Sequence, residues 1–286
     1  MRKQSLWYWL FLFPVLIALT VVVIIPFIFG LYYSFTNWNG IQSTEFVGFK
    51  HYIKLFQDGE FLHSIWFTTK FAIASVFFIN FFGLILALIV TQKLKTSKIM
   101  RTIFFMPNLI GGLILGFIWQ FIFIKVFAGI GDLLHVEGFR GWLSTTETGF
   151  WGLVILMSWQ MAGYIMVIYI AYLENIPQEL LEAAEIDGAN SFQRFRHITF
   201  PLVAPAFTVS MFLTLSNSFK LYDQNLSLTG GGPYDSTQMV AMNIFKTAFS
   251  ENQMAYAQSK AVIFFLIVTV ISLTQVYFNK KREVEM

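Results

Sequence analysis

Five carboxylates stand between residues 174 and 187, with no basic residue among them: Glu174, Glu179, Glu182, Glu185 and Asp187. Pro177 suits the first position of a helix, and acidic residues in the opening turns complement the helix dipole. Gly188 is a natural stop. The pattern predicts a short acidic helix, whose chemistry is recognition of a basic surface.

This predicted helix also has a narrow apolar ridge. Leu180, Leu181 and Ala184 share one face, and Ala183 next to Ala184 keeps the surface thin. Such a ridge flanked by carboxylates fits docking of a helix into a groove on a basic partner. An ordinary solvated loop helix would explain the residues equally well. A second helix, capped by Asn190 or Ser191 and closed by Pro201, is expected to follow.

Other chemistries find little support. With no cysteine, the chain has no disulfide framework and no thiolate metal site. The four histidines (His51, His63, His135 and His197) are scattered, and neither H-E-x-x-H nor the phosphate loop G-x-x-x-x-G-K-[ST] occurs. We therefore expect no catalytic residues, no metal site and no ATP site in this chain. A net charge of +3 is too small to suggest nucleic-acid binding.

The elements that must position these residues are membrane spans. The chain is 56% hydrophobic and only 12% charged, against about 25% charge in soluble domains. Six long runs lack any charged residue, and a bilayer crossing needs about 20 apolar residues. The predicted fold is all-α and integral to the membrane, with six spans near 9–35, 66–92, 103–124, 149–172, 202–222 and 260–279.

Lysine and arginine set the orientation of these spans. On the side of the membrane that holds both termini and the even-numbered loops there are 11 lysine and arginine residues, and on the other side there are 6. Because basic residues favour the cytoplasmic side, both termini and the acidic helix are expected in the cytoplasm. The long loops 36–65, 125–148 and 223–259 are then external.

Polar residues within spans are the default candidates for a transport pathway, because they are costly there. Asn217 and Lys220 of the fifth span are the strongest, with Gln160 as a further polar candidate and Trp119 and Tyr164 as aromatic surfaces for a sugar. Interhelical hydrogen bonding, worth about 0.6 kcal/mol per contact, is the competing explanation for any one of them. Lys220 could instead pair with Asp223, three residues on.

Three motifs of the acidic loop resemble the EAA signature of binding-protein-dependent ABC importer permeases: Glu182-Ala183-Ala184, Asp187-Gly188-Ala189 and Ile198-Thr199-Phe200-Pro201. Phe200 stands where the family has leucine, which keeps the position apolar. The segments Phe219-Lys220-Leu221-Tyr222-Asp223 and Leu228-Thr229-Gly230-Gly231-Gly232-Pro233 resemble those of carbohydrate permeases. The arrangement of the N-terminal span and the glycine-rich loop resembles the first maltose permease subunit more than its partner subunit.

The resemblance implies one half of a heterodimeric pore, with a second homologous permease, two cytoplasmic ABC ATPases and an external solute-binding protein as partners. ATP and Mg²⁺ would be bound by the ATPases, and a carbohydrate would be the substrate. Glu182, Ala183, Ala184, Asp187 and Gly188 would form the element that couples to the ATPase. The permease core would comprise residues 66–282, including the EAA loop at about 174–200, after an N-terminal segment 1–65.

An ion-coupled secondary transporter is the alternative. Proton-coupled transporters usually carry acids in the middle of a span. All 16 acids here fall in loops, tails or the ends of predicted spans. The distribution of acids therefore favours an importer whose energy comes from a partner.

Overall fold

The computed structural model describes residues 2–41, 45–92 and 95–281, which contain no β-strand beyond the isolated bridge between Thr36 and Phe46. Two basic residues used in orienting the chain, Lys93 and Arg282, lie outside these ranges. The α-helices are α1 (Arg2–Leu19), α2 (Ile25–Tyr33), α3 (Lys50–Leu55), α4 (Gly59–Val90), α5 (Ser97–Phe105), α6 (Gly112–Phe121), α7 (Phe127–Leu134), α8 (Thr146–Leu173), α9 (Gln178–Ile186), α10 (Ser191–Arg194), α11 (Phe200–Leu202), α12 (Ala204–Phe219), α13 (Asp223–Leu228), α14 (Val240–Phe245) and α15 (Met254–Lys280).

Five helical stretches in the described residues are long and apolar enough to cross a membrane: Tyr8–Tyr33, Gly59–Val90, Gly112–Leu134, Thr146–Leu173 and Met254–Lys280. Ser191–Leu202 and Ala204–Phe219 meet at a bend of 66° and make a sixth if they count as one span. The all-α integral membrane fold is confirmed. The count of six depends on this bent pair.

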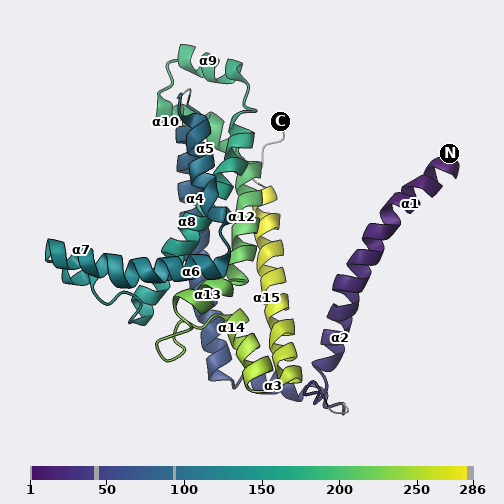
Figure 1. Ribbon diagram of the computed structural model, residues 1–286. Helices are drawn as coiled ribbons and strands as arrows, with labels where there is room; N and C mark the ends of the chain where they lie inside the picture. Colours follow the sequence, from purple (N-terminus) through teal and green to yellow (C-terminus); the bar gives the residue numbers. More distant parts are fainter. Residues whose placement is uncertain (1, 42–44, 93–94, 282–286) are drawn as a thin grey trace. The chain divides into compact units, whose positions relative to one another are not determined.

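The third predicted span was placed wrongly. Residues 103–124 do not form one helix, because α5 ends at Phe105 and α6 begins only at Gly112, with a 3₁₀ turn over Met106–Leu109 between them. Pro107 has no amide hydrogen to continue the α-helical ladder, and Ile110 adopts an extended conformation (ψ 127°). After the break, α6 and α7 run across the direction of α5, α8 and α12 (Figure 1).

The chain divides into two compact units. The first comprises Met1–Leu62 and Asn243–Leu266, and the second His63–Met242 and Ile267–Met286. Helix α8 is the centre of the second unit, with 72% of its most apolar window buried. Its residue Gly163 is required by packing, since a Cβ there would lie 1.7 Å from the carbonyl oxygen of Phe104 in α5.

Helices α6 and α13 also approach too closely for a side chain between them. A Cβ on Gly116 would lie 1.8 Å from Ser227 Oγ, and one on Gly112 would lie 2.9 Å from Asp223 Cβ. The two glycines are four residues apart and therefore share one face of α6. This face seats α13 directly on the α6 backbone.

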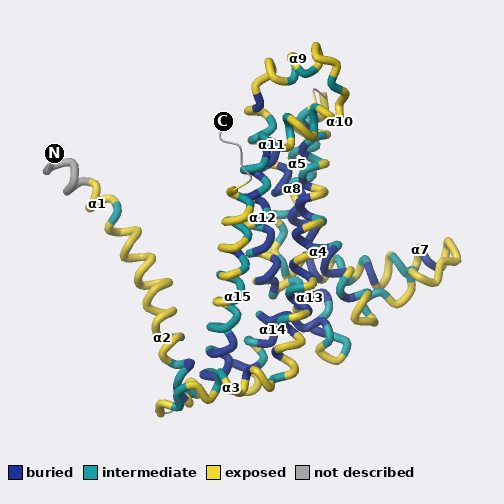
Figure 2. Tube along the Cα trace, turned by 180° about the vertical axis from the view of Figure 1, so that it is seen from behind, coloured by how far each residue is buried: buried dark blue, intermediate teal, exposed yellow. Residues whose placement is uncertain are grey.

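In the first unit, α1 and α2 are apolar but expose their side chains. The window between Tyr8 and Tyr33 has a mean hydropathy of 2.9, and none of it is buried within the chain (Figure 2). Phe27, near the start of α2, contacts Phe265 of α15, with 5.2 Å between the ring centroids. The free surface of α1 and α2 has the composition expected of lipid or partner contact.

Candidate functional site

Helix α9 carries the acidic stretch and ends as the sequence predicts. Asp187 is its C-cap, and Gly188 adopts a left-handed conformation with φ +82°. The Gly188 amide donates to the Glu185 carbonyl at 3.1 Å, and the Ala189 amide donates to the Ala184 carbonyl at 2.9 Å. These two bonds form a Schellman motif, which satisfies carbonyls that the helix end would leave free. Pro177 lies one position before the helix, which begins at Gln178.

Most of the α9 surface is exposed (Figure 2). Glu182 and Ala183 are exposed, Ala184 is half-buried, and the Ile186 side chain is 87% exposed. Leu181 packs against the hydrophobic core of the second unit, which tethers the helix from one side. Of the predicted ridge, only Leu180 is exposed, and Ala183 and Ile186 complete an exposed apolar ridge on the outside.

Two of the five carboxylates have basic partners that the local sequence does not reveal. Arg101 of α5 pairs with Glu174 at 2.5 Å, and Arg194 of α10 pairs with Glu185 at 3.1 Å. Within the described part of the chain, Glu179, Glu182 and Asp187 form no ion pair. The free charge of α9 is therefore concentrated on these three residues.

The helix after α9 begins as predicted and ends slightly later. Asn190 caps α10 in a reciprocal arrangement with Gln193, whose amide donates to Asn190 Oδ1 at 2.9 Å. Pro201 does not end this segment, because α11 continues to Leu202 before the bend into α12. Proline is tolerated there because it occupies one of the first two positions of α11, whose amides need no helical partner.

Among the pathway candidates, Gln160 has a clear structural role. Its Nε2 donates to the carbonyl of Ile110, at the break between α5 and α6, at 3.2 Å. Its Oε1 accepts a hydrogen bond from Gln224 Nε2 of α13 at 2.8 Å. Gln160 is buried and joins α8 to both segments, which matches the interhelical alternative.

Trp119 lines an apolar cavity of about 680 Å³ in the second unit, together with Trp151, Ser158 and Trp159. The Trp119 and Trp159 rings meet edge-on at 5.7 Å. Tyr164 lies in α8 next to Phe105, at 6.5 Å between ring centroids. The cavity wall has few polar groups, so it lacks the hydrogen-bonding partners that a sugar needs.

Asn217 and Lys220 lie exposed at the end of α12. Asn217 Nδ2 donates to the carbonyl of Leu213, one turn back, at 2.9 Å. No ion pair links Lys220 to Asp223 in the described chain. Among the described residues, no hydrogen bond, ion pair or ring contact joins any two of the five pathway candidates, so they do not form one site within this chain.

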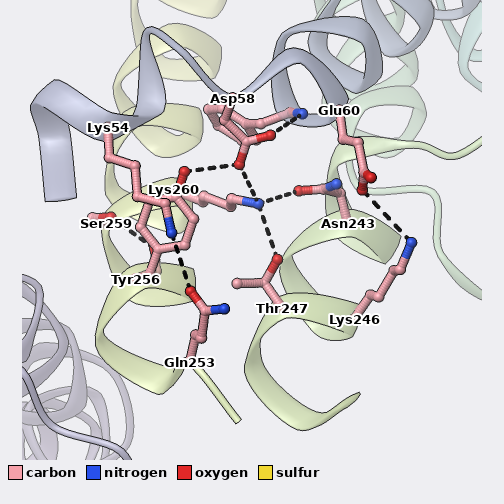
Figure 3. Close-up of polar contacts among 11 residues, drawn as sticks. Lys54, Asp58, Glu60, Asn243, Lys246, Thr247, Gln253, Tyr256, Ser259 and Lys260 are labelled. Carbon is pink, nitrogen blue, oxygen red and sulfur yellow. Dashed lines mark hydrogen bonds and ion pairs between the residues drawn. The ribbon is translucent and has the colours of Figure 1, made fainter. Parts of the chain in front are cut away.

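The first unit contains a buried ionic cluster that was not predicted from the sequence (Figure 3). The Lys260 ammonium, 3% exposed, lies 2.9 Å from Asp58 Oδ2, Asn243 Oδ1 and Thr247 Oγ1. The Tyr256 hydroxyl donates to Asp58 at 2.8 Å. Only the position of Lys260 within the apolar start of a span could have signalled this cluster, because Asp58 is far away in sequence.

Burial alone would raise the pKa of the Asp58 carboxyl. The amide of Phe61, the Lys260 ammonium and the Tyr256 hydroxyl all favour its charged form, and together they outweigh burial. The pKa of Asp58 is therefore held below its ordinary value. The cluster ties the starts of α4 and α15 to the segment of α14 that begins at Asn243.

The second unit has a buried polar network of its own. Tyr169 of α8 donates to Asn80 Oδ1 of α4 at 3.0 Å, and Asn80 Nδ2 donates to Thr214 Oγ1 of α12 at 3.1 Å. This chain of bonds links three spans. In residues 2–41, 45–92 and 95–281, no group of three or more His, Asp or Glu side chains is placed to hold a metal.

Residues 79–284 match the family described as binding-protein-dependent transport system inner membrane component. The chain belongs to this family. It is a multi-pass permease subunit, and ATP hydrolysis in such systems is carried out by a separate subunit. The family assignment agrees with the EAA resemblance of the α9 loop.

Similar proteins cover nearly the whole chain. The probable starch degradation products transport system permease protein AmyD of Thermoanaerobacterium thermosulfurigenes is 62% identical over 99% of this chain and 97% of its own length. The trehalose/maltose transport system permease protein MalF of Thermococcus litoralis is 30% identical over 98% of this chain and 95% of its own length. Thus, the similarity includes the N-terminal segment as well as the core.

A solved bacterial alginate ABC transporter, in complex with an alginate pentasaccharide-bound periplasmic protein, has the same fold. One of its chains matches with a TM-score of 0.84 at 21% identity, covering 98% of this chain and 96% of that chain. At this identity, the match establishes the arrangement of the helices and no more.

Proposed function

We propose that this permease forms half of the membrane pore of an ATP-driven sugar importer. A second homologous permease would complete the pore, two cytoplasmic ABC ATPases would supply the energy, and an external binding protein would deliver the sugar. ATP and Mg²⁺ would be held by the ATPases, since this chain has no phosphate-loop sequence. The proposed core is 66–282.

The observation that carries this proposal is the exposed α9 helix. Its Schellman end fixes the direction of the chain after Gly188, and its ridge offers Ala183 and Ala184 to a groove. Glu182 is exposed and is free to meet a basic residue on the ATPase. In this arrangement Glu182, Ala183, Ala184, Asp187 and Gly188 form the coupling element.

The placement of two loops supports the proposed orientation. Helix α9 and the segment following α13 lie at opposite ends of the second unit (Figure 1). Cytoplasmic termini and a cytoplasmic α9 would therefore place the loop after α13 outside the cell, where a binding protein could reach it. The plasma membrane of a bacterium is the location that fits this topology.

A carbohydrate is the proposed substrate class, because AmyD is named for starch degradation products and MalF for trehalose and maltose. Asn217 and Lys220 are exposed polar groups at the end of a span and are the best candidates for contact with sugar hydroxyls. Trp119 and Tyr164 supply aromatic surface. Gln160 would act by holding α13 rather than by touching the sugar.

Reconstitution of the complete importer tests the proposal. The chain, its second permease, the ATPase and the binding protein would be placed in proteoliposomes with a panel of radiolabelled maltooligosaccharides. The expected result is uptake that requires both ATP and the binding protein. Uptake by this chain alone, driven by a sodium or proton gradient, would contradict the proposal and favour a secondary transporter.

A further inference from the structure

The loop after α13 presents one aromatic side chain entirely to solvent. Tyr234 is 103% exposed, more than any other large hydrophobic side chain among the described residues. Tyr234 and Asp235 both adopt left-handed backbone conformations, with φ +52° and +57°. Such conformations are uncommon for residues other than glycine and persist only where the surrounding structure enforces them.

Hydrogen bonds on both sides of Tyr234 enforce this conformation. Thr237 Oγ1 donates to the carbonyl of Gly232 at 2.7 Å, and the Thr237 amide donates to the carbonyl of Gly231 at 2.9 Å. Asn225 of α13 donates to the Thr237 carbonyl at 2.9 Å and accepts from the Met239 amide at 3.1 Å. Asn225 and Thr237 are fully buried. The exposed tyrosine therefore stands on a rigid base.

The loop is also attached to the start of α8. Thr146 Oγ1 donates to Ser236 Oγ at 2.8 Å, and His63 Nε2 lies 3.1 Å from the Ser236 carbonyl. Asp235 and Glu147, both exposed, flank this attachment along the chain. The surface thus combines one projecting aromatic ring with two carboxylates, which we call the Tyr234 surface.

We propose that the Tyr234 surface docks the external solute-binding protein, with the tyrosine ring entering an apolar pocket and the carboxylates facing a basic rim. A tyrosine held in place before binding gives contact area at little cost in conformational entropy, and such residues are common anchors of protein interfaces. Two carboxylates are unfavourable next to anionic lipid, so a protein partner fits better than a membrane surface.

This inference rests on the proposed function and its orientation. At the opposite end from α9, the loop is on the side where a binding protein arrives (Figure 1). The loop is held by residues other than Tyr234, since the bonds described above involve only the main chain and side chains of its neighbours. The ring can therefore be removed while the loop keeps its shape.

The test measures stimulation of ATP hydrolysis by the sugar-loaded binding protein, titrated against the complete importer in proteoliposomes. Tyr234→Asn removes the ring but tolerates the left-handed backbone. For this variant, we expect the concentration of binding protein that gives half-maximal stimulation to rise at least about tenfold, the loss of affinity typical of an anchor residue. Tyr234→Phe keeps the ring and should stay within about twofold.

Tyr277→Asn is the matched control, because Tyr277 is also exposed but lies near the other end of the last span. Its titration should match the wild type. An unchanged half-maximal concentration for Tyr234→Asn, or a loss of maximal rate alone, would overturn the docking assignment. A wild-type importer that no sugar-loaded binding protein stimulates would instead overturn the proposed function, so the two failures are distinguishable.

Discussion

Lys260 and Asp58 form an ion pair at 2.9 Å in which both side chains are largely out of solvent, with exposures of 3% and 16%. Every donor of the ammonium has a partner, since Asn243 and Thr247 accept the other two hydrogen bonds (Figure 3). An uncompensated charge at this depth is costly. The pair therefore holds together segments that are distant in the chain.

Removing one partner of this pair should strongly destabilise the protein. We expect Lys260→Met to lower the free energy of unfolding by about 3–5 kcal/mol, because Asp58 would be left buried without its counter-charge. Thermal unfolding in detergent measures the change. Glu60→Gln is the control, since Glu60 pairs with Lys246 at 3.6 Å in an exposed position and should cost at most about 1 kcal/mol. Equal effects of the two substitutions would contradict this account.

The same pair predicts how stability depends on pH. The pKa of Asp58 is lower in the folded protein than its ordinary value of 3.8. The contribution of the Asp58 charge to the free energy of unfolding should be fully present above pH 3.8 and should be lost as the pH falls toward the lowered pKa. The unfolding temperature should fall as the pH is lowered from 7 to 3, and this fall should be smaller in Asp58→Asn than in the wild type. Parallel curves for the two proteins would rule out this role of Asp58.

The seat of α13 on α6 can be tested at Gly116. In Gly116→Val the side chain would overlap Ser227, and overpacking of this kind costs about 1–3 kcal/mol. The unfolding temperature should fall accordingly. Gly129→Ala is the control, because a Cβ there meets nothing within 4 Å, and the change should be neutral or stabilising by up to about 1 kcal/mol. A Gly116→Val protein with the unfolding temperature of the wild type would show that α6 and α13 can move apart freely.

A bulky β-branched residue at Gly188 should break the coupling between this permease and its ATPase. Gly188 has φ +82°, a conformation that valine adopts only with strain, so Gly188→Val should distort the end of α9. Membrane insertion should be normal, while uptake and stimulated ATP hydrolysis fall. Gly188→Asn should retain more activity, since asparagine tolerates this conformation. Wild-type uptake in Gly188→Val would refute the coupling assignment.

Transport kinetics can decide whether Asn217 belongs to the pathway. The Asn217 amide bonds only to its own helix among the described residues, so Asn217→Ala should leave folding intact. A pore role predicts a lower uptake rate or weaker apparent affinity at normal expression. The lost hydrogen bond to sugar corresponds to about 1 kcal/mol, or about fivefold in uptake. Unchanged kinetics would remove Asn217 from the proposed pathway.

Local features were predictable because their causes are local. The end of α9 at Gly188 and the start of the next helix at Asn190 or Ser191 depend on residues within one turn, so they were predictable, and the structure places the cap at Asn190. The apolar spans followed from the absence of charge over about 20 residues. The break at Pro107 was missed because the hydropathy of the run is continuous, and neighbouring helices can absorb a proline without any break.

Pairing across the chain was not predictable in the same way. The partner of Glu174, the bridge made by Gln160 and the burial of Asp58 with Lys260 join residues far apart in sequence. The pair of Glu185 with Arg194 spans only nine residues, but it joins two separate helices. Likewise, nothing in the residue types distinguishes the exposed Tyr234 from interfacial tyrosines. Only the packing of the helices decides which polar groups meet.

The carboxylates of the α9 loop show most clearly which features depend on the local sequence and which depend on the tertiary structure. Their types and spacing determined a short acidic helix and its end at Gly188, and the resemblance of this loop to the EAA signature indicated the class of transport protein. The tertiary structure decided that Arg101 and Arg194 neutralise two of the five and that the remaining charge lies on an exposed ridge. The reason is physical: helix formation and membrane partition sum over neighbouring residues, whereas ion pairs depend on where the folded chain places distant ones.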